Sequence, residues 1–171
     1  MRRILALLAP CVIAASMPLA AQKTPDRPVL VLAGEGGAYP HLESPHLVYG
    51  GTAHLRVAGW GLLGLGLIGK SDEYESRMFG GAVSRQLFRS RALHGGVFVG
   101  YGEYSETGWS GIERAAPGIM GGATLSLESS RFIMQLTALE FRGRYQGNDV
   151  LAPFNFSAPR VTLGVGVNVI P

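Results

Sequence analysis

The chain has 171 residues, a formal net charge of +3 and a single cysteine, which exclude a disulfide-stapled scaffold. Its first residues place Arg2 and Arg3 before an apolar stretch, residues 4–15, and a run of small residues at 18–21. This order predicts a secretory signal peptide, residues 1–21, cleaved after Ala21. Cleavage removes Cys11 and leaves a mature region, residues 22–171, that has the length of one domain. It also lowers the net charge to +1, so the mature protein is not expected to be a strongly basic nucleic-acid binder.

Eight segments of the mature region alternate apolar residues with small or polar ones. Alternation with a period of two is typical of β-strands, and the high glycine content disfavours helices. Each segment has about ten residues, the length that a tilted strand needs to cross a bilayer, whereas no apolar run approaches the roughly 20 residues of a membrane helix. In chain order the expected strands are 28–37, 47–58, 60–69, 77–88, 94–104, 117–128, 130–141 and 159–170.

Long and short connections alternate between these segments. The gaps after the first, third, fifth and seventh segments are longer than those after the second, fourth and sixth. This rhythm is typical of an up-and-down barrel with short periplasmic turns and longer outer loops. The fold class predicted is therefore all-β: an eight-stranded antiparallel up-and-down transmembrane barrel with both termini on the periplasmic side.

The last segment, VTLGVGVNV at 161–169, shows the two faces of such a strand most clearly. Every odd position is Val or Leu, and the even positions are Thr162, Gly164, Gly166 and Asn168. The interior of an eight-stranded barrel is only just wide enough for side chains to fill, which suits the small polar row. The apolar row is then expected to face lipid.

Aromatic residues support the same orientation, since they are expected in two girdles at the membrane interfaces. The predicted girdle residues are Tyr49, Trp60, Phe79, Phe88, Tyr101, Phe132 and Phe141. The seventh segment breaks the alternation, because Gln135 shares a face with Leu139 while Glu140 shares one with Met134. A β-bulge near Ala138 is expected to repair this register.

Polar residues on the inward rows are predicted to form a lumen network that ties the strands together, because buried charges require partners. The network residues are Glu35, Thr52, His54, Arg56, Gln86, Gln135 and Glu140. The sequence His41-Leu-Glu-Ser-Pro-His46 holds three potential metal ligands, but their place on one loop, expected to be flexible, is weak evidence for convergent ligands, and no metal site is predicted. Neither His54 nor His94 has an obvious serine near it in sequence, so neither catalysis nor a cofactor is predicted.

With its leader, eight alternating segments, loop rhythm and terminal LGVGVNV, residues 22–171 resemble the small outer-membrane β-barrels of the OmpA and OmpX type. The chain departs from that family at its last residues, which are Val169-Ile170-Pro171, whereas family members commonly end with an aromatic residue that the assembly machinery recognises. The resemblance implies a monomeric outer-membrane protein with a structural or surface-interaction role. Its implied partners are outer-membrane lipid, lipopolysaccharide and the barrel-assembly machinery.

The expected outer loops are 38–46, 70–76, 105–116 and 142–158, and their exposed aromatics are the predicted contact residues: Trp109, Tyr145, Phe154 and Phe156. Two alternatives remain open at this point. A soluble, lipocalin-like periplasmic barrel would bury the Val/Leu row around an apolar ligand, and a lipid A-modifying barrel hydrolase would use the histidines.

Overall fold

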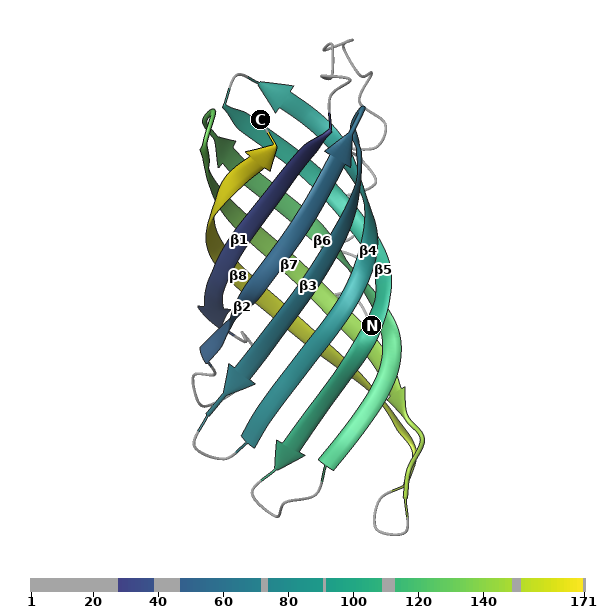
Figure 1. Ribbon diagram of the computed structural model, residues 1–171. Coiled ribbons are helices and arrows are strands. Elements are labelled where there is room, and N and C mark those ends of the chain that lie inside the picture. Colours follow the sequence, from purple (N-terminus) through teal and green to yellow (C-terminus); the bar gives the residue numbers. More distant parts are fainter. Residues whose placement is uncertain are drawn as a thin grey trace, which may run out of the picture.

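The computed structural model is a single closed antiparallel barrel of tilted strands, in which each strand pairs with its sequence neighbours and the first pairs with the last (Figure 1). The structure describes residues 28–38, 47–71, 74–90, 92–108, 113–148 and 152–170. The strands are β1 (Val29–Ala38), β2 (Leu47–Val57), β3 (Trp60–Lys70), β4 (Tyr74–Ser90), β5 (Leu93–Gly108), β6 (Glu113–Glu128), β7 (Phe132–Tyr145) and β8 (Phe154–Ile170). The predicted fold class, an all-β, eight-stranded antiparallel up-and-down barrel, is confirmed. The predicted signal peptide lies outside the described residues.

The strands are longer than the sequence pattern indicates, and they extend into three of the predicted outer loops. β4 begins at Tyr74, β5 ends at Gly108, β6 begins at Glu113, and β7 and β8 form a hairpin paired as far as Tyr145 and Phe154. The ranges 70–76, 105–116 and 142–158 are therefore largely strand, because the backbone ladders continue where the apolar alternation stops. No helix long and apolar enough to cross a membrane occurs in the described part of the chain.

Short turns join the strands at one end of the barrel, where the C-terminus also lies (Figure 1). The β2–β3 turn consists of Ala58 and Gly59, whose φ angles of 50° and 80° are both positive. Two positive φ angles in a two-residue loop define a type I′ turn, whose twist matches that of the flanking strands. We call this the turn end, and the opposite end the loop end.

The outer face of the barrel carries the apolar rows. Val99, Ile119 and Val165 each have about 60% of their surface exposed, as have the aromatic residues Tyr101 and Phe132. All eight strands contribute large exposed apolar side chains to this belt, among them Leu32, Leu55, Leu62, Val83, Leu125, Met134, Leu136, Leu163 and Val167. The orientation expected for the last strand is confirmed, since its Val/Leu row is exposed and Thr162 is buried.

The lumen is filled by side chains rather than open. An apolar cluster of inward-facing residues, drawn mainly from β3 to β7, occupies much of it, and Leu67, Met78, Met120 and Phe141 have no exposed surface. Polar side chains gather separately around Glu35 and, at the turn end, around Glu128. The expectation of a mostly small, polar inner face therefore describes only part of the lumen.

The bulge predicted near Ala138 is absent. β7 pairs in unbroken register with β6 from Glu128↔Ile133 to Gly118↔Gly143. Because the alternation is unbroken, every second residue from Gln135 to Phe141 faces inward. Phe141 is completely buried, so its assignment to the aromatic girdle is wrong. The same alternation turns Glu140 outward, where it pairs with Arg142 at 2.7 Å, so Glu140 is not a lumen residue.

Register shifts do occur at two other positions. One lies between Gln86 and Phe88 in β4, and the other between Leu30 and Val31 in β1. Before the shift in β4, even-numbered residues such as Ser84 face inward; after it, the even-numbered Phe88 faces outward. Phe88 is thus exposed, as are the other predicted girdle residues except Phe141: Tyr49, Trp60, Phe79, Tyr101 and Phe132.

Candidate functional site: the polar lumen and its turn-end pocket

Glu35 of β1 is the centre of the first polar group. Its carboxylate is 5% exposed and accepts hydrogen bonds from the hydroxyls of Thr52, Thr137 and Thr162 and from the amide of Gln135. These donors come from β2, β7 and β8, and the distances of the bonds from Thr52 and Gln135 are 3.1 and 3.2 Å. Three of these donors converge on Oε1 and Thr162 donates to Oε2, so both carboxylate oxygens have partners. The group binds four strands around one buried acid.

Glu128, the last residue of β6, is the centre of the second group. Arg56 of β2 donates to both of its carboxylate oxygens, at 2.5 and 2.9 Å, which is the bidentate geometry of a strong ion pair. Ser126 donates to the same carboxylate at 2.9 Å, and Nδ1 of His94 lies 3.1 Å from it. The Glu128 side chain is only 8% exposed, so the ion pair links β2 and β6 inside the barrel, and the contact with His94 adds β5.

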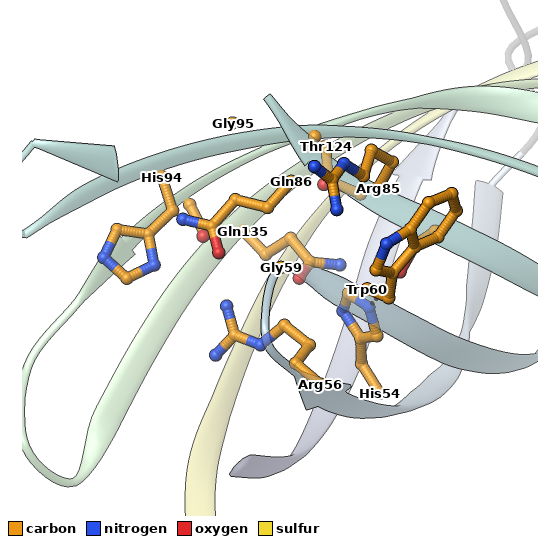
Figure 2. A pocket seen from close by; sticks show the side chains of 13 residues that line it. His54, Arg56, Gly59, Trp60, Arg85, Gln86, His94, Gly95, Thr124 and Gln135 are labelled. Carbon is orange, nitrogen blue, oxygen red and sulfur yellow. Dashed lines mark hydrogen bonds between the residues drawn. The ribbon is translucent and has the colours of Figure 1, made fainter. Parts of the chain in front are cut away.

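A small pocket of about 30 Å³ opens beside these residues at the turn end. Figure 2 shows the side chains of His54, Arg56, His94 and Gln135 around it, with the guanidinium of Arg56 extended toward His94. Nε2 of His54 lies 2.7 Å from Oγ of Ser84, across the strand β3. On the outer side of the pocket the guanidinium of Arg85 stacks over Trp60, 4.7 Å from the ring centroid. The volume is enough for water and too small for an organic substrate.

The histidine–serine pair lacks the third member of a catalytic triad among the described residues. Such a triad needs a carboxylate on the imidazole nitrogen that faces away from the serine. Glu128 instead contacts His94 and Arg56. No cluster of three metal-ligating side chains occurs in the described residues, and the potential ligands His41, Glu43 and His46 lie outside them.

The structure brings together some of the predicted network residues and separates others. Glu35, Thr52 and Gln135 meet in one group, and Arg56 and His54 lie in the turn-end group. Gln86 lines the pocket and donates to the backbone oxygen of Phe88 at 3.3 Å. Glu140 lies outside, for the reason given above.

Sequence reasoning missed several members of these groups. Ser126 and Glu128 alternate with Leu125 and Leu127, which is a sufficient signal for an inward polar row. Arg160 was also missed: it is 1% exposed, shares the parity of Thr162, and donates to Ser76 of β4 at 2.9 Å across the lumen.

The predicted loop contacts have a different environment from the one expected. Tyr145 is 7% exposed, and Phe156 is partly buried against the apolar cluster, with its ring 5.2 Å from that of Tyr104. Phe154 remains 38% exposed at the loop end. Their inward parity places them at the mouth of the lumen rather than on free loops. Trp109 lies outside the described residues.

Comparison with solved structures identifies the architecture. The barrel is similar to the N-terminal β-barrel domain of Pseudomonas aeruginosa OprF, with a TM-score of 0.62 and 16% identity over 82% of this chain and 96% of that one. It is also similar to Neisserial surface protein A (NspA), with a TM-score of 0.58 and 10% identity over 82% and 94% of the two chains. The chain has the fold of an eight-stranded outer-membrane barrel. No protein-family model matches the sequence, and a search of curated proteins gives no match.

Proposed function

We propose that this chain is an exported outer-membrane protein with a structural or surface-interaction role and no catalytic activity. The observation that carries this proposal is the belt of large apolar side chains around a barrel whose strands are all paired. Exposing a contiguous apolar surface of this extent to water is unfavourable, whereas contact with lipid chains removes that cost. The similar structures, the OprF domain and Neisserial surface protein A, have the same architecture and support the location.

The orientation follows from the connections. The C-terminus and the short turns lie at one end, which in this class faces the periplasm, and the longer connections then face outward. In this orientation the proposed partners are the surrounding lipid and lipopolysaccharide, with the barrel-assembly machinery needed for insertion. A lipocalin-like carrier would need the apolar rows inside, and the observed exposure of Val165 at 62% opposes that alternative.

The location is tested by membrane fractionation combined with gel mobility before and after boiling. We expect the protein in the outer-membrane fraction and a band that shifts on heating, because a folded barrel resists cold detergent. Val165→Arg places a charge on the belt and is expected to cost about 2–4 kcal/mol in the membrane. Asn155→Arg is the matched control, because it is exposed on the same strand beyond the belt.

Recovery of the wild-type protein in the soluble periplasmic fraction contradicts the proposal and favours a soluble carrier. Equal insertion of the two arginine variants contradicts the assignment of the belt. The absence of catalysis is tested separately, with lipid extracts and His54→Ala and His94→Ala variants. A turnover that the wild type shows and these variants lose would favour the hydrolase instead.

A further inference from the structure

The ladder between β6 and β7 stops before the loop end of the barrel. Its last pair is Gly118↔Gly143, whereas β6 remains paired with β5 as far as Thr107↔Glu113, and β7 with β8 as far as Tyr145↔Phe154. Residues 113–117 therefore have no partner strand on their β7 side among the described residues. Pro117 lies where the ladder ends, and it has no N–H to continue the pairing.

A pocket of about 100 Å³ lies in the seam left between β6 and the β7–β8 hairpin. Four aromatic side chains from β5, β7 and β8 line it: Tyr104, Tyr145, Phe154 and Phe156. The ring of Tyr145 is 5.5 Å from that of Phe154, which in turn is 6.3 Å from that of Phe156, so the rings form a continuous apolar wall. The opposite wall is the unpaired stretch of β6 itself, at Ala115 and Ala116.

The charges at this pocket compensate each other. Arg114 lies 3.2 Å from Glu106, which also accepts a hydrogen bond from the hydroxyl of Tyr104 at 3.0 Å. The neighbouring outward residues Glu113, Arg144 and Ser157 are exposed and polar, so the seam lies beyond the apolar belt and is reached from water. A neutral occupant from the aqueous side fits these surroundings better than a lipid chain.

We propose that this seam binds an extended segment of a partner polypeptide by strand addition to residues 113–116. Strand addition combines main-chain hydrogen bonds to an unpaired edge with a pocket for a side chain, and both features occur together here. At about 100 Å³ the pocket is of the same order as the cavity of about 150 Å³ that holds benzene in an engineered protein. Because it is also open on one side, it takes one apolar side chain, such as phenylalanine or leucine. The proposal does not depend on the location of the protein, since the seam belongs to the folded barrel.

The probe is a labelled nine-residue peptide of alternating threonine and valine with a central phenylalanine. Its binding to the purified full-length barrel in detergent micelles is measured by fluorescence polarisation. We expect saturable binding, at least about tenfold weaker binding of the peptide with a central alanine, and loss of binding when alternate backbone nitrogens are methylated. Hydrogen exchange should slow at alternate residues of 113–116 when the unmodified peptide binds, because the N–H groups that face away from β5 acquire acceptors.

Phe154→Ala removes one wall of the pocket and is expected to weaken peptide binding at least about tenfold. Phe79→Ala is the matched control, because Phe79 is an exposed aromatic residue of the belt, and should leave binding unchanged. No binding, equal binding of the methylated peptide, or equal effects of the two variants would overturn the proposal. A dimer that forms without peptide and dissociates in Phe154→Ala would instead assign the seam to a second copy of the chain.

Discussion

Glycine at position 100 is predicted to be required by the curvature of the barrel. Gly100 faces inward on β5, and a Cβ there would lie 2.1 Å from the carbonyl oxygen of Gly81 and 2.5 Å from Cα of Ala82, on the neighbouring strand β4. Cβ atoms essentially never approach other heavy atoms within 3.0 Å. The methyl group of Gly100→Ala would therefore push two paired backbones apart by about 1 Å. Overpacking of this kind costs about 1–3 kcal/mol, and rigid backbone on both sides favours the upper end.

Gly81→Ala is the matched control, because it adds the same methyl group one position away on the outer face. A Cβ at Gly81 has only one neighbour within 4 Å, the carbonyl oxygen of Leu63 at 3.9 Å. The φ angles of both glycines are negative, so alanine is compatible with the backbone at either site. Removing the flexibility of the unfolded chain at Gly81 should stabilise the barrel by about 0.4–1 kcal/mol.

The measurement is urea unfolding of the two variants in lipid vesicles, followed by gel mobility and by tryptophan fluorescence. We expect a difference of about 3 kcal/mol between them, with Gly81→Ala the more stable. If Gly100→Ala unfolds at the same urea concentration as the wild type, β4 and β5 have room for a methyl group at this position. Lack of space between the strands would then not explain the glycine.

Three further predictions concern side chains of the lumen and use the same unfolding assay. Glu35→Ala leaves the hydroxyls of Thr52, Thr137 and Thr162 without their acceptor, whereas the amide of Gln135 still donates to Thr137. The variant should cost at least about 3 kcal/mol, because each orphaned group costs about 1–3 kcal/mol; a loss below about 1 kcal/mol would show that water replaces the carboxylate. Arg56→Met should cost about 3–5 kcal/mol by leaving Glu128 without its cation, and adding Glu128→Met should restore most of this loss; no recovery would mean that the pair is not coupled. Phe141→Ala should cost about 3–5 kcal/mol and Glu140→Ala less than about 1 kcal/mol, whereas a bulge in β7 would reverse that order.

Much of the architecture could be predicted because a strand that crosses a bilayer must alternate. The two rows of β8 and the position of the short connection at Gly59 follow from local sequence alone, whereas the type of that turn comes from the structure. The register of β7 could not be decided in this way, because Leu139 and Phe141 are apolar residues on an inward row. The reason is the apolar cluster in the lumen, which makes inside and outside similar in chemistry over part of the barrel.

The contacts within the candidate site were harder to predict than its residue types. Alternation indicates that Glu35 and Thr162 face inward, but strand shear decides which inward residues meet across the lumen. Glu128 and His94 meet because the β4–β5 and β6–β7 turns lie side by side at the same end. The seam at residues 113–117 depends on where two ladders stop, and only Pro117 marks that position in the sequence.

The hydrogen bond from Thr162 to Glu35 has a consequence for the order of folding. It joins residues 127 positions apart and lies beside the pairing that joins the first strand to the last. Contacts of such long sequence separation form late, since the intervening chain must be ordered first. In a barrel that has not yet closed, the carboxylate of Glu35 therefore lacks part of its set of hydrogen-bond donors. Pairing of β1 with β8 supplies the missing donor and removes the free-energy cost of leaving the carboxylate incompletely hydrogen-bonded. The buried acid thus favours a closed barrel over an open sheet.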